Sequence, residues 1–139
     1  MLQFVFDTDH LTLFHHGNVF VGQRFAVHAV AAVGITVVTV EESLRGRLAA
    51  LAQRLDGPRR IARYALLEAT LRLLRQFPIA SFDGPAEQHF QQLLGMQLRI
   101  GSQDLTIAAI ALAHGLVVVS RNRRDFGRIP GLRIEDWSV

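Results

Sequence analysis

The sequence predicts an α/β fold with a central, mostly parallel sheet flanked by helices. Strand-like apolar runs alternate with helical patterns along the chain, as they do in parallel sheets. The clearest runs lie at residues 2–6, 35–40 and 116–120 and are rich in branched and aromatic side chains. With 139 residues, 50% of them hydrophobic, the chain can bury one sizeable core. We therefore expect a single domain over residues 1–139.

The N-terminal half is expected to hold two strands and four helices. Strand 2–6 is followed by a helix that Thr8 or Asp9 caps and that reaches residue 16, where Gly17 interrupts it. A helix over 19–33 ends at Gly34, and the β-branched run 35–40 is predicted to be a strand. Leucines at helical spacing indicate a helix over 41–54, and a break at residues 57–58 separates it from a helix over 58–76. These last two helices are expected to form an αα-hairpin.

The C-terminal half is expected to complete the sheet. A short strand over 79–82 precedes a turn at 83–85 and a helix over 86–98. Ser102 is predicted to cap a helix over 103–114 that ends at Gly115. Strand 116–120 then leads into a polar loop over 121–128, and 132–134 is expected to be an edge strand.

Composition excludes several classes of protein. The chain has no cysteine, so neither a disulfide framework nor a thiolate metal site is possible, and this is compatible with the cytoplasm. The first residues lack the basic segment of a signal peptide. The longest uncharged stretch, residues 25–40, contains His28 and falls short of the roughly 18 to 20 apolar residues of a membrane span. We expect no membrane partner.

Four dispersed acids carry the main functional signal. Asp7 and Asp125 follow apolar runs, Glu42 lies just past the run 35–40, and Asp104 opens an alanine-rich helical pattern. Ligands of open α/β sheets bind outside the carboxyl ends of the strands, so these acids are expected to share one edge. Carboxylates that crowd one small space need a cation to remain ionised, and an all-oxygen shell suits Mg²⁺ or Mn²⁺.

Each acid also has a purely structural interpretation. Asp9 can cap the following helix while Asp7 binds local backbone amides. Glu41 and Glu42 both lie near a helix start, where the helix dipole favours acids, and periodicity does not choose between them. The same dipole accounts for Asp104, although the apolar helix that follows would hold that carboxylate rigidly.

The segment 120–126 offers oxygen donors and cations together. Ser120, Asn122 and Asp125 can supply oxygens, and the arginines between them can bind phosphates, although a solvated loop explains the same residues. All fifteen cationic residues of the chain are arginines, whose planar fork suits phosphate, and the net charge of +3 permits nucleic-acid binding. No histidine spacing suggests zinc, so we interpret the histidines as structural and keep His10, beside the first acids, open.

The combined motifs resemble the PIN-domain ribonucleases, and among them the VapC-type toxins of type II toxin–antitoxin systems. The resemblance spans nearly the whole chain. Its most specific parts are residues 100–109, 115–120, 125–126 and 129–132, with the first motif at 6–9 and the second at 37–42 followed by Gly46.

The resemblance implies a Mg²⁺- or Mn²⁺-dependent endoribonuclease. Its first three acids correspond to Asp7, Glu42 and Asp104, which would hold metal, and the distance to Gly46 favours Glu42 over Glu41. Members often carry Asp or Asn at the place of Asn122 and a further acid before Phe. Because Asn122 cannot supply charge, Asp125 is the candidate for the fourth acid. Ser120 and Asn122 would orient the scissile phosphate or a water. The candidates for RNA phosphate contacts are Arg121, Arg123 and Arg124.

The resemblance also implies partners, namely an RNA substrate, a second copy of the chain in a homodimer and a cognate VapB-type antitoxin whose C-terminal segment covers the acidic groove. Two alternatives stay open. A catalytically weak PIN domain could serve as an RNA- or antitoxin-binding module. A haloacid-dehalogenase-like phosphatase would use Asp7 as a nucleophile, but that family expects a downstream lysine and this chain has none.

Overall fold

A computed structural model describes residues 1–139 and shows a five-stranded sheet in the order β3-β2-β1-β4-β5. All four strand pairs are parallel, and β5 lies at an edge, as predicted. The strands are β1 (Phe4–Phe6), β2 (Val33–Thr36), β3 (Ile79–Ala80), β4 (Val117–Val119) and β5 (Arg133–Glu135). The predicted α/β class with a parallel sheet is confirmed.

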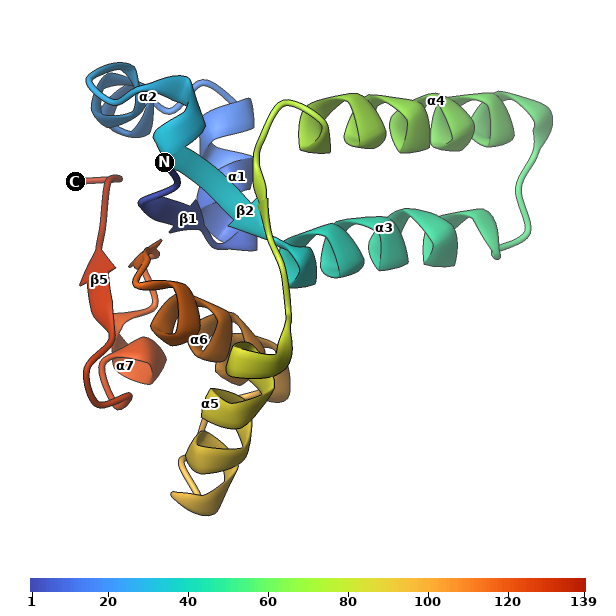
Figure 1. Cartoon of the computed structure of the whole chain (residues 1–139). Helices are drawn as coiled ribbons and strands as arrows, with labels where there is room; N and C mark the ends of the chain where they lie inside the picture. The colour runs from blue at the N-terminus through green and yellow to red at the C-terminus, as the bar shows by residue number, and fades with distance from the viewer.

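Seven α-helices and one 3-10 helix connect the strands. They are α1 (Thr8–His15), α2 (Val19–Ala26), the 3-10 helix η1 (Val30–Ala32), α3 (Val37–Leu51), α4 (Gly57–Leu74), α5 (Gly84–Gly95), α6 (Ser102–His114) and α7 (Arg123–Phe126). Helices α3 and α4 run side by side as a hairpin that projects away from the sheet, while α5 and α6 lie together on another side (Figure 1). No helix is both long enough and apolar enough to cross a membrane.

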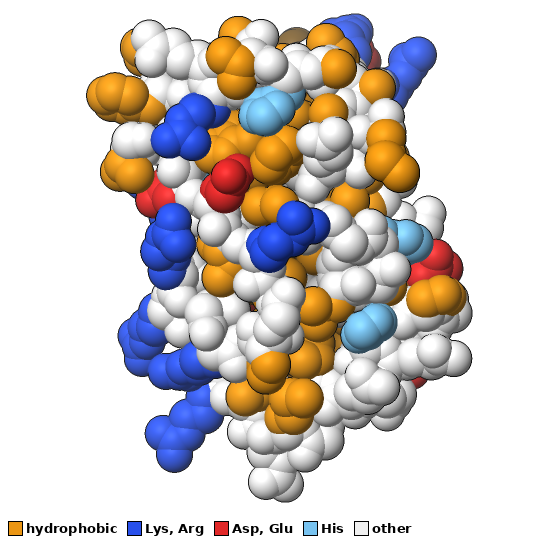
Figure 2. All heavy atoms as spheres, turned by 60° about the vertical axis from the view of Figure 1, so that its left-hand side comes forward, with side chains coloured by type: hydrophobic (Ala, Val, Ile, Leu, Met, Phe, Trp, Pro, Cys, Tyr) orange, Lys and Arg blue, Asp and Glu red, His pale blue; other side chains and the backbone are white.

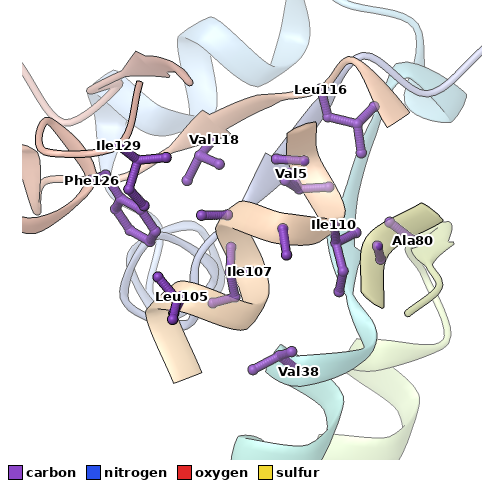
Figure 3. Close-up of a cluster of buried hydrophobic side chains, with 14 of the residues drawn as sticks. Val5, Val38, Ala80, Leu105, Ile107, Ile110, Leu116, Val118, Phe126 and Ile129 are labelled. Carbon is purple, nitrogen blue, oxygen red and sulfur yellow. The ribbon is translucent and has the colours of Figure 1, made fainter. Parts of the chain in front are cut away.

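Two apolar clusters hold the sheet in place. One packs α6 against β1 and β4, with Val5, Ile107, Ile110 and Val118 buried at its centre (Figure 3). The other gathers aromatic side chains around Phe6 and includes the fully buried Trp137 near the C-terminus. Because α6 is enclosed by the first cluster, residues in its first turn have a fixed position relative to the ends of β1 and β4.

The structure corrects several predicted boundaries. Residues 37–40 belong to α3 and not to a strand, because Thr36 caps a helix there and its hydroxyl accepts from Thr39 N. The predicted helix 19–33 stops at Ala26 and gives way to η1 and β2. Ser102 is the first residue of α6, and the cap is Gly101. Residues 123–126, predicted as loop, form the short helix α7.

Gly34 is required by a close approach of backbone. A Cβ placed there would lie 2.4 Å from the Pro78 carbonyl oxygen and 2.8 Å from the Leu2 Cδ1. Pro78 directly precedes β3, which pairs with β2, and Ile35 N of β2 donates to the same Pro78 oxygen. A side chain would therefore push apart the two strands on that side of the sheet.

Candidate metal centre

The site begins where two neighbouring strands end. Phe6 of β1 is in register with Val119 of β4, so the residues that follow them, Asp7 and Ser120, come side by side. The Ser120 hydroxyl donates to Asp7 Oδ2 at 2.5 Å, between residues 113 positions apart in sequence. The parallel pairing of β1 and β4 therefore places a buried carboxylate and a buried hydroxyl at the carboxyl edge of the sheet.

Both oxygens of the Asp7 carboxylate accept hydrogen bonds. Asp7 is the cap of α1, and its Oδ1 accepts from His10 N at 2.7 Å, while Oδ2 accepts from Ser120. Its residue exposure is only 8%. The structural role expected for Asp9, capping α1, thus belongs to Asp7, and the remaining lone pairs of the Asp7 carboxylate are available to a cation.

Glu42 reaches the same place from the hairpin. It lies in the second turn of α3, where its Oε1 accepts from the Thr8 hydroxyl at 3.1 Å. Its neighbour Glu41 is exposed and pairs with Arg45 on the outer surface of α3. The two acids that periodicity left equivalent therefore have different positions, and only Glu42 faces the other carboxylates.

Asp104 comes from the first turn of α6 and is half-buried. Its Oδ2 accepts from Asn122 Nδ2 at 3.2 Å. Burial is the largest cause that raises the pKa of Asp104, followed by repulsion from the negative charges of Asp7, Glu42 and Asp125, and the Asn122 hydrogen bond only partly offsets these effects. A cation would relieve the part of this rise in pKa that comes from repulsion among the carboxylates.

These groups surround a cleft of about 350 Å³. Its walls are almost entirely polar and come from the ends of β1 and β4, from α3 and from α6. The lining residues are Asp7, Thr8, Asp9, Glu42, Asp104, Ile107, Arg121 and Asn122. Three of the four predicted acids meet there, and Asp125 does not line it.

Asp125 is hydrogen-bonded to Asn122 and lies outside the lining of the cleft. Asn122 caps α7 and accepts from Asp125 N, and its Nδ2 also donates to Asp125 Oδ2 at 3.2 Å. The same amide nitrogen donates to Asp104, so Asn122 ties the two carboxylates together. Asp125 consequently acts on the cleft through its charge, which contributes to the raised pKa of Asp104.

Ser120 and Asn122, which are predicted to orient the scissile phosphate or a water, both contact carboxylates of the site. Ser120 is fully buried and its hydroxyl is bonded to Asp7, so it orients that carboxylate and has no open surface to offer a phosphate. Asn122 lines the cleft, but its amide is committed to the two acids beside it. Both residues belong to the support of the carboxylates.

The three arginines have different environments. Arg121 lines the cleft and donates through Nε and an Nη to both oxygens of Asp9, at 2.7 and 2.8 Å. These hydrogen bonds and the charge of Asp9 raise the pKa of Arg121. Arg123 and Arg124 are exposed on α7, outside the lining of the cleft.

Sequence reasoning gave Thr8 and Asp9 mainly a capping role and left His10 open. Thr8 supports Glu42, and Asp9 neutralises Arg121 at the mouth of the cleft. Fully buried His10 forms with Asp7 and Asp9 a group whose ligand atoms lie within 4.8 Å of one another. Thr8 and Asp9 lie just after a predicted strand, and this position could have marked them as site residues in the sequence. The surroundings of His10 depend on the C-terminal segment, which local sequence does not reveal.

The chemistry of the donors fits a divalent cation bound by oxygens. Asp7, Glu42 and Asp104 supply carboxylates from three separate elements, and neighbours hold each one in place. Hard cations such as Mg²⁺ and Mn²⁺ prefer such ligands. An acidic cleft with this support, at the carboxyl edge of a parallel sheet, is a site of the class that suits metal-assisted hydrolysis of phosphate esters.

Comparisons with known proteins agree with this class. The PIN domain family matches residues 13–132. The tRNA(fMet)-specific endonuclease VapC of Shigella flexneri is 32% identical over 99% of this chain and 100% of its own length. A protein of the same name from Salmonella typhimurium is 40% identical over 68 residues, which are 46% of this chain and 52% of that protein.

Solved structures share the fold. A DNA-bound VapBC from Salmonella typhimurium matches with a TM-score of 0.80 and 29% identity, covering 99% of both chains. VapBC-1 from nontypeable Haemophilus influenzae matches with a TM-score of 0.78 at 19% identity, covering 99% and 100% of the two chains. The chain belongs to the PIN domain family, in its VapC branch, and the resemblance predicted from the motifs is confirmed.

Proposed function

We propose that this protein is the toxin of a type II toxin–antitoxin pair and acts as a Mg²⁺- or Mn²⁺-dependent endoribonuclease in the cytoplasm, with residues 1–139 as its PIN domain. The observation that carries the proposal is the convergence of Asp7, Glu42 and Asp104 on one cleft, where the pKa of Asp104 is raised. Membership of the VapC branch, whose named relatives are endonucleases and ribonucleases, supports it.

Each carboxylate would bind the cation from a position that the fold maintains. Ser120 and the His10 amide orient Asp7, Thr8 orients Glu42, and Asn122 orients Asp104. When bound, the cation lowers the pKa of a water molecule and offsets the charge that develops on the phosphate. Either Glu42 binds the cation through its carboxylate or it accepts the proton of the attacking water.

The RNA would approach over a surface rich in arginine. Arg121 lies at the cleft, and Arg123 and Arg124 are exposed beside it. Cationic side chains, which are all arginines in this chain, line one margin of the face in Figure 2. Transfer RNA is the first substrate to test, because two relatives are named as tRNA(fMet)-specific endonucleases.

An antitoxin segment has a place to bind next to the cleft. A hollow of about 290 Å³ shares Thr8 and Glu42 with the cleft and continues along α1 and α4, where Leu66 and Leu73 line it. A partner chain lying there would cover the carboxylates, and structural neighbours are toxin–antitoxin complexes. We also propose that the toxin is a homodimer.

The test is cleavage of transfer RNA by purified protein with Mg²⁺ or Mn²⁺, and with EDTA. Asp7→Asn should reduce cleavage by at least about 100-fold. It should retain the fold, since Asn caps a helix about as well as Asp. Glu41→Gln, which removes an acid outside the cleft, is the matched control and should cleave as the wild type does.

Cleavage that persists in EDTA, or in Asp7→Asn at the wild-type rate, would refute the metal site. Wild-type protein that binds RNA and antitoxin but cleaves nothing would instead favour the binding-module alternative.

A further inference from the structure

His10 is a fully buried polar residue whose surroundings are unusual. It lies in the first turn of α1, with an exposure of 0%, and its ring stacks on Phe6. Its Nε2 accepts from the backbone N–H of Trp137 at 3.2 Å. Because Nε2 therefore provides the lone pair, the proton of the neutral ring is on Nδ1.

That Nδ1 has no hydrogen-bond partner, which is rare for a buried donor. The acidic oxygen beside Nδ1 is Asp7 Oδ1, 3.6 Å away, and Asp136 Oδ1 lies 3.5 Å from the other ring nitrogen, Nε2. A movement of well under 1 Å by His10 or Asp7 would make a hydrogen bond with normal geometry. The unsatisfied donor thus points to the one carboxylate of the cleft that is itself almost buried.

We propose that His10 is a positioning residue for Asp7, and that the segment around Trp137 sets the orientation of His10. This inference rests on the proposed metal-dependent function. With metal bound, Nδ1 would donate to Asp7 Oδ1, which already accepts from His10 N. Two donors would then occupy Oδ1 while Ser120 occupies one lone pair of Oδ2, and Asp7 would hold the cation through the oxygen that keeps a free lone pair.

The C-terminal segment is built to hold the ring in this tautomer. Trp137 is fully buried and packs against Phe4, Phe6 and His28. Its indole donates to Glu135 at 3.0 Å, and Glu135 O accepts from Ser120 N. The C-terminal segment therefore connects Trp137, whose N–H donates to His10 Nε2, with Ser120, which supports Asp7 from the other side.

The experiment measures Mn²⁺ affinity by isothermal titration calorimetry and, separately, RNA cleavage. His10→Phe fills the site without a donor and should weaken Mn²⁺ binding about 10–100-fold. His10→Asn carries an amide nitrogen near the position of Nδ1 and should recover affinity to within about threefold of wild type. His28→Phe, which replaces the imidazole stacked on Trp137 with a ring that has no nitrogen, is the matched control and should bind Mn²⁺ like wild type.

A readout on the wild-type protein does not depend on the folding of a variant. In nitrogen-15 spectra of the imidazole, Mg²⁺ should leave the proton on His10 Nδ1 and move its signal downfield. Loss of that proton, as direct ligation would cause, or no change at all, would overturn the proposal. So would wild-type Mn²⁺ affinity in a folded His10→Phe. A wild type that binds Mn²⁺ with these responses but cleaves no RNA would refute the proposed function and leave the role of His10 intact.

Discussion

The charge of Asp104 should destabilise the protein when no cation is present. Its raised pKa means that ionising this carboxyl is less favourable in the folded chain than in the unfolded one. The stability from this group is fully present below the unfolded pKa of about 3.9, and it is lost as the pH rises through the folded value. Asp104→Asn, which cannot ionise, should therefore unfold at a higher temperature than wild type at pH 7.5 in EDTA.

The expected change in the free energy of unfolding is the balance of two opposing contributions. The substitution weakens the charge-assisted bond from Asn122, but the pKa is raised overall, so burial and repulsion from Asp7 and Glu42 outweigh that bond. Because Asp104 is half-exposed and water screens its charge, we expect Asp104→Asn to raise the free energy of unfolding by roughly 0.5–1 kcal/mol, which raises Tm by about 2–5 °C. The difference should vanish near pH 3.5.

Mn²⁺ should reverse the order of stability. At a concentration of 100 times Kd, the cation stabilises wild type by about 2.7 kcal/mol, a rise in Tm of about 8–13 °C. If Asp104→Asn lowers affinity about 100-fold, the same concentration contributes only about 0.4 kcal/mol to that variant. Differential scanning calorimetry with and without Mn²⁺ measures both effects, and Glu41→Gln controls for loss of one negative charge.

The reasoning would be refuted if Asp104→Asn melted below wild type in EDTA at pH 7.5, or if Mn²⁺ stabilised both proteins equally. The first result would mean that the Asn122 bond outweighs the repulsion, and the second that Asp104 does not bind the cation.

Three further predictions concern neighbours of the cleft and the sheet. Thr8→Val removes the donor to Glu42 and should weaken Mn²⁺ binding about tenfold by calorimetry; unchanged affinity would exclude this support. Arg121→Ala leaves Asp9 unpaired and should raise KM for RNA and reduce the salt dependence of binding by about 1 in the log–log slope, which filter binding measures. Gly34→Ala places a Cβ against a backbone oxygen and should cost about 1–3 kcal/mol of unfolding free energy in urea, whereas wild-type stability would contradict the close approach.

Local pattern by itself determined much of this protein. The alternation of apolar runs and helical repeats predicted a parallel α/β sheet, because strands and helices have different side-chain periods and parallel strands need helical connections. It also located Asp7 at the end of β1 and Asp104 in the first turn of α6. These are properties of short segments, and they hold wherever the segments pack.

Only the tertiary structure decided which groups meet. Helical periodicity left Glu41 and Glu42 equivalent and only the family motif favoured Glu42; the packing of α3 beside α1 places Glu42 at the cleft, where it bonds to Thr8. The pairing of β1 with β4 buried Ser120 against Asp7. The contact of His10 with Trp137 joins residues 127 positions apart, so it depends on long-range packing that local periodicity does not encode.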